Sequence, residues 1–435
     1  MIWVQLVVVL SCIYLGSRLG SIGVGFAGAI GVLVLTLGLG LEPGSIPVDV
    51  ILIIMTVIGA VASMQVAGGL DWLVKKAEMI LRSQPKYITI LAPTVTYFMT
   101  LLAGTGHTAF STLPVIAEVA KENGVRPSRP LSIAVIASQV AITASPVSAA
   151  VVVFSDFLEP YNVGYLDLLS ISVPTSFVAV MLTACVCNFL GLDLEKDEIY
   201  QERMAAGLIR KRKRDERATP KVTAGLSVLI FALSILAVVI YATAISPTVG
   251  LIENPALPRD SAIMLFMMFA ACMIVILCKI DTSDIIKAQT FKSGMSAAMC
   301  VLGVAWLGNT FVGAHIESIK AMAGNILVGY PWLLAVTLFF ASMLLYSQAA
   351  TTRALMPAAL TLVDPVTAIA SFAAVSALFV LPTYPTLLAA VEMDETGSTR
   401  IGKLVFNHPF FLPGTLCISL CVSFAFVLAP MILGL

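Results

Sequence analysis

The sequence predicts an all-α polytopic membrane protein built from two repeats of inverted topology, with re-entrant hairpins and broken helices. Three observations predict this fold class: an apolar composition, two similar segments on either side of a basic centre, and an uneven distribution of Lys and Arg. Hydrophobic residues make up 59% of the 435 residues and charged residues only 11%, whereas soluble domains carry about 25% charged residues. The mean hydropathy of +0.99 agrees, so the lipid bilayer is the expected environment.

Charge and cysteine usage exclude several function classes. The chain has 25 basic and 25 acidic residues, a balance that argues against a nucleic-acid partner. Its eight cysteines show no CxxC or Cys/His ligand spacing, so we expect neither a metal site nor a disulfide. The sequence contains no HExxH, GxSxG or Walker A motif, and it therefore predicts no enzyme and no cofactor.

Twelve segments approach the length of a membrane span, which is about 20 apolar residues. Several are short or interrupted, so we expect about ten full crossings. The first segment lacks the basic n-region of a cleavable signal peptide and is expected to remain in the membrane. The candidate spans are 2–17, 21–40, 48–70, 87–103, 131–154, 165–190, 222–246, 261–279, 294–313, 331–346, 366–391 and 407–434.

A basic, polar stretch at 191–221 interrupts the apolar pattern and includes the run RKRKR at 210–214. We interpret it as a solvated loop, and the positive-inside rule places it in the cytoplasm. It divides the chain into a first repeat, 1–190, and a second repeat, 222–435.

The two halves contain similar segments. Residues 91–114 align with 334–357 without a gap, and both segments end in proline. Upstream, 64–76 aligns with 309–321, and each is interpreted as a span that ends in glycine before an amphipathic stretch. Downstream, each half has an interrupted span, at 138–152 in the first and 379–391 in the second. Together these correspondences predict an internal duplication.

The positions of charged residues predict that the two repeats have opposite orientations. Counting spans outward from the cytoplasmic linker, the basic cluster Lys75, Lys76, Arg82 and Lys86 falls inside, and the acidic connection 155–165 falls outside. The first repeat then starts outside and the second starts inside, with both termini outside. Inverted repeats of this kind are typical of secondary transporters.

Four polar breaks interrupt the predicted spans, in two pairs that correspond between the repeats. Irregular backbone within a bilayer is tolerated only where it is buried in protein or lines a cavity, and helix N-termini bind anions through free N–H groups. One such break is more often a simple kink, because Pro, Gly, Ser and Thr are common in membrane helices, but two matched pairs favour a binding site. They are named break 1 (104–108), break 2 (143–148), break 3 (347–352) and break 4 (382–386).

Three kinds of side chain near the breaks suggest how a substrate is held. Arg353 can bind a carboxylate with its planar guanidinium, although it can also pair with an acidic side chain or reach the membrane interface. His107 can titrate near neutral pH, although a histidine that only donates or accepts a hydrogen bond is the commoner case. Gln139 and Gln348 are amide donors for a carboxylate or, alternatively, contacts between helices.

The chain resembles the anaerobic four-carbon dicarboxylate transporters of Gram-negative bacteria, the Dcu family. The resemblance extends over nearly the whole length and is weakest in the central linker. It implies exchange of aspartate, fumarate or malate for succinate across the inner membrane, and a relation to the ion-transporter superfamily, whose members use re-entrant hairpins, elevator motion and homo-oligomers such as dimers. The matching segments are 64–73, 84–98, 103–121, 142–152, 302–312, 344–357, 381–403 and 406–416.

The resemblance also implies which residues hold the substrate, because hairpin tips and broken helices bind the carboxylates in that superfamily. Carried over by position, these residues are Thr105, Gly106, His107, Ser145, Pro146, Ser148, Ser347, Gln348, Thr351, Thr383, Pro385 and Thr386. The polarity of the breaks adds Thr143, Thr352 and Arg353. The tips read GTGHT and SQAAT instead of the Ser-Asn-Thr signatures of sodium-coupled relatives, so sodium coupling is not implied.

Three alternatives remain at this point. The first is an inorganic-anion or cation/proton antiporter on the same scaffold, for which an essential His107 and a pH-dependent rate would be evidence. The second is a sensor-associated membrane scaffold, in which the 191–221 linker binds a partner. The third is a channel, which would carry large uncoupled currents.

Overall fold

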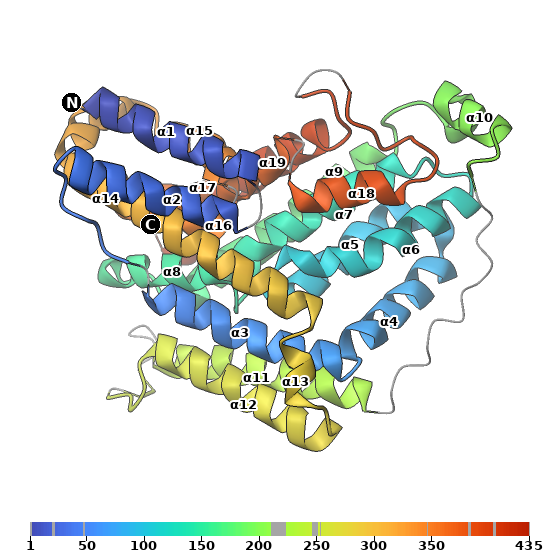
Figure 1. Cartoon of the computed structure of the whole chain (residues 1–435), viewed down its shortest axis with the longest axis horizontal. Coiled ribbons are helices and arrows are strands. Elements are labelled where there is room, and N and C mark those ends of the chain that lie inside the picture. The colour runs from blue at the N-terminus through green and yellow to red at the C-terminus, as the bar shows by residue number, and fades with distance from the viewer. Residues whose placement is uncertain are drawn as a thin grey trace.

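The computed structural model of the chain describes residues 2–19, 22–46, 48–209, 223–245, 251–252, 254–345, 347–381, 384–402 and 406–434. Within these ranges the regular elements are helices, which confirms the predicted all-α class. The helices form two units that differ in packing (Figure 1). The outer unit consists of α1–α4 and α11–α14, and the inner unit consists of α5–α9 and α15–α19.

Most helices of the outer unit are apolar and pack side by side. α2 packs against α1 and α14, and α3 packs against α12 and α14. In Figure 1, α11 and α12 lie along the bottom of the molecule with α3 above them. The bounds are α1 Ile2–Leu19, α2 Gly23–Leu33, α3 Val48–Val66, α4 Gly69–Ser83, α11 Ala224–Ala244, α12 Arg259–Cys278, α13 Thr282–Ile285 and α14 Gln289–Gly329.

The inner unit contains one order of elements twice: a helical hairpin, a helix broken in its middle, and a long helix. The first copy consists of α5 Ile88–Ala103, α6 Ala109–Glu122, α7 Ser128–Val140, α8 Ala149–Leu158 and α9 Tyr165–Cys187. The second consists of α15 Leu333–Leu345, α16 Gln348–Ala359, α17 Pro365–Ser371, α18 Pro385–Met393 and α19 Phe411–Leu433. A tighter 3₁₀ segment, Phe372–Phe379, extends α17 toward break 4.

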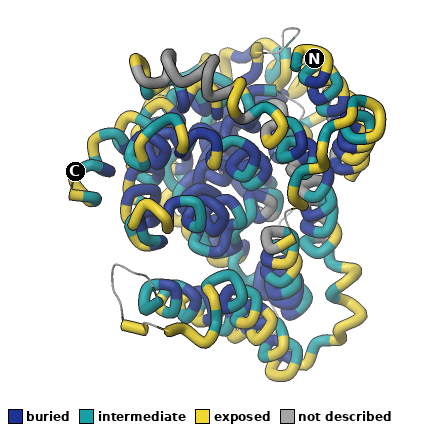
Figure 2. Tube along the Cα trace, turned by 90° about the vertical axis from the view of Figure 1, so that its left-hand side faces the viewer, coloured by how far each residue is buried: buried dark blue, intermediate teal, exposed yellow. Residues whose placement is uncertain are grey.

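The two copies exchange partners in the inner unit. α6 of the first hairpin packs against α18 of the second copy, and α16 of the second hairpin packs against α8 of the first copy. The long helices α9 and α19 pack against each other. This reciprocal packing brings the four breaks toward the centre of the molecule, where the chain is mostly buried (Figure 2).

The outer unit departs from the predicted repeat at one junction. Gly68 has φ +87° and lies between α3 and α4, which are bent by 71°. Its aligned residue, Gly313, lies inside α14, which runs without a break for 41 residues from Gln289 to Gly329. The expectation that span 294–313 ends at its glycine is therefore wrong. A glycine allows a left-handed residue but does not require one, and in a helix interior it costs only about 1 kcal/mol.

Glycines bring α2 and α14 into backbone contact. A Cβ atom added to Gly303 would overlap the carbonyl oxygen of Gly25, and one added to Gly28 would lie 2.5 Å from the carbonyl carbon of Gly303. Small residues allow membrane helices to approach this closely, and the resulting contact is held by van der Waals packing. The contact fixes α2 on α14 within the outer unit.

The linker is not a solvated loop over its first part, contrary to expectation. It contains a short helix, α10 Glu198–Ala205, and Asp197 before it is only 3% exposed. The Asp197 carboxylate accepts from Arg126 at 2.7 Å and from Arg400 at 3.3 Å, so α10 is docked on the inner unit. The basic run 210–214 lies outside the described residues.

The charges around Asp197 set the pKa of its carboxyl group. Burial alone raises that pKa, but the Arg126 and Arg400 guanidinium groups and the Tyr200 amide outweigh it, and the net pKa lies below the ordinary value. The carboxylate is therefore ionised at neutral pH.

Length and apolarity identify six described helices that are able to cross a bilayer, or seven if the bent pair α3–α4 counts as one span. Four shorter apolar helices accompany them. The chain is thus a multi-pass membrane protein, while the figure of about ten crossings stays a prediction.

Candidate functional site

Break 1 ends α5 with a left-handed glycine. Gly104 has φ +68°, and its N–H donates to Thr100 O at 2.8 Å. A Cβ atom at Gly104 would lie 3.0 Å from the carbonyl oxygen of Val147 in break 2, so the two breaks are in contact. Thr105 is partly buried and Gly106 is buried in the turn that leads into α6. The side chain of His107 lies outside the described part of the structure.

Break 2 consists of the end of a 3₁₀ segment, Ala141–Ala144, followed by a turn before α8, and side chains bind several of its backbone groups. The Ser145 hydroxyl donates to Leu101 O at 2.7 Å, which ties break 2 to α5. Ser148 is the N-cap of α8: its hydroxyl accepts from the Val151 N–H at 3.2 Å and donates to Ile142 O at 2.6 Å. The Tyr165 hydroxyl donates to the carbonyl of Pro146.

Break 3 also starts a capped helix. Ser347 is the N-cap of α16, and its hydroxyl accepts from the Ala350 N–H at 3.2 Å. The Thr351 and Thr352 hydroxyls donate to carbonyls one turn back, both at 2.8 Å. Thr143 of break 2 does the same to Val140 O. These three hydroxyls follow the helix-internal alternative, in which Ser and Thr bond back to their own helix.

Break 4 separates the 3₁₀ segment from α18. The N–H of Ala377, a residue with non-helical ψ, donates to the Ser342 hydroxyl of α15 at 3.2 Å. Pro385 occupies the first position of α18, where its missing N–H costs nothing, and its side chain is exposed. Thr386 is fully buried. Pro382 and Thr383 lie outside the described residues.

Breaks 1, 3 and 4 meet at the fully buried carboxamide of Gln139, near the end of α7. Gln348 Nε2 of break 3 donates to Gln139 Oε1 at 3.2 Å, and Gln139 Nε2 donates to Thr386 Oγ1 of break 4 at 3.3 Å. A Cβ atom at Gly106 of break 1 would lie 2.8 Å from Gln139 Nε2. Break 2 begins four residues after Gln139. The result is a polar cluster built from both repeats.

From the sequence, Gln139 was predicted to be an amide donor or a contact between helices, and not the centre of this cluster. A second missed residue is Ser376, whose hydroxyl donates to Gln139 O at 3.2 Å. An amide side chain in the apolar run SQVAI was the available signal for Gln139. No comparable signal marks Ser376, because serines bond within membrane helices in many places.

Arg353 lies in the second turn of α16 and is partly buried. At 3.6 residues per turn, it projects about 140° around the helix from Gln348. The helix therefore places the guanidinium on a different face from the glutamine cluster. Its role as a substrate ligand stays a prediction.

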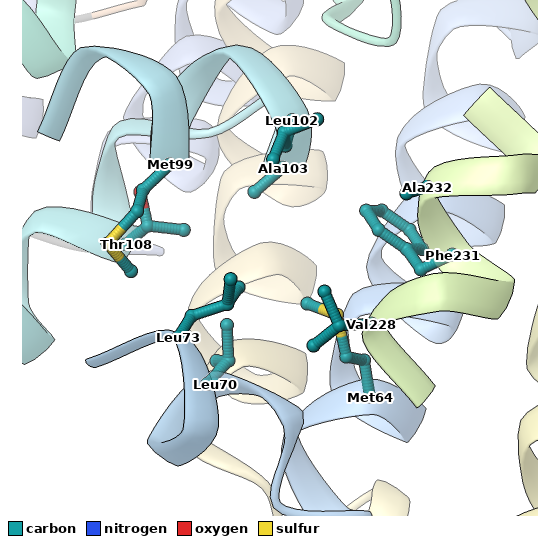
Figure 3. Close-up of a pocket in the computed structure, with 10 residues that line it drawn as sticks. All are labelled: Met64, Leu70, Leu73, Met99, Leu102, Ala103, Thr108, Val228, Phe231 and Ala232. Carbon is teal, nitrogen blue, oxygen red and sulfur yellow. The ribbon is translucent and has the colours of Figure 1, made fainter. Parts of the chain in front are cut away.

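A pocket next to break 1 differs in character from the glutamine cluster (Figure 3). Ala103 and Thr108 line one side of it, and Val228 and Phe231 of α11 line the other. Thr108 is the one polar residue among the ten that line it. Such a lining provides little to replace the water around a dianion, so the pocket is a gap between the two units and not the candidate site.

Among the described residues no group of three His, Cys, Asp or Glu side chains is placed to hold a metal ion.

The fold and these paired breaks define a membrane transporter in which interrupted helices meet inside the protein. The family model described as "Anaerobic c4-dicarboxylate membrane transporter" matches residues 1–433. The chain belongs to this DcuA/DcuB family, which confirms the resemblance drawn from the sequence.

Individual relatives agree with the family match. The chain is 67% identical over 430 residues to the C4-dicarboxylate transporter DcuA of Wolinella succinogenes, covering 99% of each chain. It is 56% identical over the full length of both chains to DcuA of Escherichia coli K12. It is 37% identical to the anaerobic C4-dicarboxylate transporter DcuB of Escherichia coli O6:H1, over 98% of each. These relatives are transporters and not enzymes.

A solved structure supports the fold at a greater distance. The YdaH transporter of Alcanivorax borkumensis, whose crystal structure has been described as revealing an unusual topology, superimposes with a TM-score of 0.54 at 12% identity. The match covers 99% of this chain and 97% of that one. At this identity the likeness shows the fold alone.

Proposed function

We propose that the protein exchanges C4-dicarboxylates, namely aspartate, fumarate or malate against succinate, across the bacterial inner membrane. One observation carries the proposal: three helix breaks from two repeats converge on a buried polar cluster, in a chain whose relatives are named C4-dicarboxylate transporters.

Binding a dicarboxylate requires replacements for its water. Hydroxyls near the breaks, the Gln348 amide and the N-terminal N–H groups of α6, α8 and α16 provide neutral donors. Arg353 contributes a positive charge from the adjacent face of α16, which lowers the cost of moving two carboxylates out of water. A helix N-terminus and its dipole favour anions without a dedicated counter-ion.

Exchange follows if the empty site crosses the membrane slowly. Without a substrate the donors of the breaks lack charged acceptors, and their passage through the low-dielectric interior is unfavourable. A dicarboxylate bound from either side lowers this barrier. The inner unit then carries the site past the outer unit in an elevator-like movement, and the α2–α14 glycine contact keeps the outer unit rigid.

The same proposal includes orientation and assembly. Figure 1 draws the N- and C-termini at the left of the molecule and α10 at the right, which supports a cytoplasmic linker and periplasmic termini. An outer unit that stays fixed while the inner unit moves requires an anchor, and a second copy of the chain provides one, so we include a homodimer.

Counterflow in proteoliposomes tests the proposed function. Vesicles containing purified protein and loaded with unlabelled succinate are expected to accumulate labelled fumarate or aspartate at least about tenfold faster than unloaded vesicles. Equal uptake in loaded and unloaded vesicles contradicts exchange, and large uncoupled currents indicate a channel. An Arg353→Ala variant is expected to exchange several-fold more slowly, while exchange at the normal rate removes Arg353 from the binding site.

A further inference from the structure

The side-chain N–H bonds of Gln139 and Gln348 are long. Gln348 Nε2 donates to Gln139 Oε1 at 3.2 Å and to Gln139 O at 3.3 Å. Gln139 Nε2 donates to Thr386 Oγ1 at 3.3 Å and to Ser138 Oγ at 3.4 Å. Ordinary N–H···O bonds have lengths of about 2.9–3.0 Å. Both carboxamides are therefore buried but only weakly bonded.

Hydroxyl donors at the breaks make shorter bonds, as O–H···O bonds generally do. The Ser148 and Ser145 hydroxyls donate at 2.6 and 2.7 Å, and the Thr351 hydroxyl donates at 2.8 Å. The N–H groups of Val151 and Ala350 that the serine caps accept also bond at 3.2 Å. What distinguishes the two amides is therefore that they are buried side chains that face each other across the repeats.

We propose that Gln139 and Gln348 are paired substrate-binding residues that recognise a carboxylate of the transported diacid, and that they bind each other only while the site is empty. The inference rests on the proposed function and adds the residues that select the substrate. A carboxylate oxygen takes the place of the amide–amide bond, because hydrogen bonds to an ionised acceptor are shorter and about twice as strong as neutral ones.

The positions of the two amides fit this role. Gln139 belongs to the first repeat and Gln348 to the second, so a ligand between them is held by both copies. Gln139 is 0% exposed and Gln348 is 5% exposed. Gly106 leaves just enough room for the Gln139 amide, because a Cβ atom there would lie 2.8 Å from Nε2. Neutral amides also let the empty site satisfy itself, which an arginine pair cannot do.

Mere contact between helices is the competing explanation, and substrate selectivity separates the two. Glutamate in place of Gln348 has nearly the same shape, accepts hydrogen bonds but does not donate them when ionised, and repels a carboxylate. The glutamate side chain does accept hydrogen bonds from the N–H groups of a carboxamide. A Gln348→Glu variant is therefore expected to prefer a monoamide of the substrate over the diacid, whereas a glutamine that only joins helices has no effect on this preference.

The experiment measures inhibition of succinate counterflow at pH 8 by unlabelled succinate and by succinamate, its monoamide of the same size. In the unmodified protein, succinate is expected to inhibit at about tenfold lower concentration than succinamate. In Gln348→Glu this ratio is expected to fall at least about tenfold. A ratio that stays within twofold of the unmodified protein, at any overall rate, overturns the inference.

The matched control is Gln65→Glu. Gln65 lies in α3 of the outer unit, where its Oε1 accepts from the Thr290 N–H at 3.1 Å, and glutamate keeps that acceptor. The selectivity ratio is expected to stay unchanged. A change as large as that in Gln348→Glu overturns the inference, because the effect then follows from added charge anywhere in the protein.

Gln348→Asn keeps the test decisive if the glutamate variant fails to fold, which size-exclusion chromatography reports. Asparagine retains the donor but withdraws it by one methylene. The succinate concentration for half-maximal exchange is expected to rise about tenfold, with maximal exchange within twofold of normal. An unchanged half-maximal concentration overturns the inference. Absence of counterflow in the unmodified protein contradicts the proposed function itself, and normal counterflow with unchanged selectivity in the variants contradicts only the role of the glutamines.

Discussion

The two repeats match element by element in the inner unit but not in the outer unit. In the inner unit a hairpin, a broken helix and a long helix occur in the same order in both copies, and they exchange partners reciprocally. In the outer unit, α3 and α4 are bent by 71°, while the corresponding part of the second repeat is the continuous helix α14.

The difference shows where symmetry is needed. The glutamine cluster draws on breaks of both copies, so a distortion of either copy of the inner unit displaces groups that face the same site. The outer helices are not tied to each other in this way and only have to support the inner unit. Changes in the two units are therefore expected to have different consequences.

The largest expected effect comes from the backbone contact in the outer unit. Valine in Gly303→Val has to displace the backbone of Gly25, and we expect it to destabilise the protein by about 3 kcal/mol or more. Gly313→Val is the control, since no atom outside its own helix lies within 4 Å of its added Cβ. Thermal unfolding in detergent is expected to show a large loss for the first variant and a small one for the second. Equal losses would disprove the role of the contact.

The next effect concerns the docking of the linker on the inner unit. Asp197→Asn removes the charge that Arg126 and Arg400 contact. We expect the free energy of unfolding at neutral pH to fall by about 2 kcal/mol. This loss is smaller than is usual for buried ion pairs, because the side chain of Arg400 is 46% exposed. The difference in melting temperature between this variant and the unmodified protein in detergent measures the loss of stability.

The contacts of Asp197 with Arg126 and Arg400 also predict that the stability of the protein depends on pH. The folded-state pKa of Asp197 is lowered, so its stabilisation is complete above the ordinary aspartate pKa of about 3.9 and is lost as the pH falls through the lower, folded-state pKa. The melting temperatures of Asp197→Asn and the unmodified protein are expected to differ at pH 7 and to converge as the pH falls below about 3.9. A difference that persists at low pH would show that the carboxylate charge is not the cause.

The bend between α3 and α4 gives a smaller effect. Alanine at Gly68 has to adopt φ +87°, at a cost of about 1–2 kcal/mol. Alanine at Gly313 replaces a helical glycine and is expected to stabilise α14 by up to about 1 kcal/mol. Opposite shifts of the melting temperature in the two variants would establish that the junctions differ in solution. Shifts of the same sign would contradict the asymmetry of the outer unit.

These comparisons also show what the sequence reveals and what it hides. The breaks were predictable because unsatisfied backbone groups inside a bilayer are costly, and the chain must provide Gly, Pro and hydroxyl residues where a helix stops. The predicted end of a span at its glycine is confirmed for α3 at Gly68 but is wrong for Gly313, which lies in a continuous helix. Both conformations are open to glycine, and tertiary packing selects one.

The candidate site was predicted by region but not residue by residue. Gln348 and Thr386 lie in the cluster, whereas the hydroxyls of Thr143, Thr351 and Thr352 bond back to their own helices. A threonine in a membrane helix can bond to a carbonyl of its own helix or to a group on another helix. Which of the two it does depends on the helix that packs against it. The prediction of a solvated linker was wrong for a related reason. From the sequence alone a charged residue such as Asp197 is expected in solvent, because its partner, Arg126, comes near only in the folded protein.

The smallest effects are expected at the capped helix starts, where the inner unit is less symmetric than its element order suggests. Serine caps α8 in the first copy and α16 in the second, while the N-caps of α6 and α18 make no side-chain hydrogen bond to their helices. Ser148→Ala and Ser347→Ala are each expected to cost about 1 kcal/mol.

Ser148→Ala should be the more damaging of the two, because that hydroxyl also donates to Ile142 O at 2.6 Å. Ser155→Ala is the matched control, since the Ser155 hydroxyl is equally buried but donates only to Val152 O of its own helix, and its loss is expected to change stability by less than about 0.5 kcal/mol. Thermal unfolding of the three variants in detergent ranks them. A loss for Ser155→Ala as large as for Ser148→Ala would mean that burial of a hydroxyl, and not the cap at break 2, determines the effect, and the breaks would then contribute no more to stability than any other polar position in the inner unit.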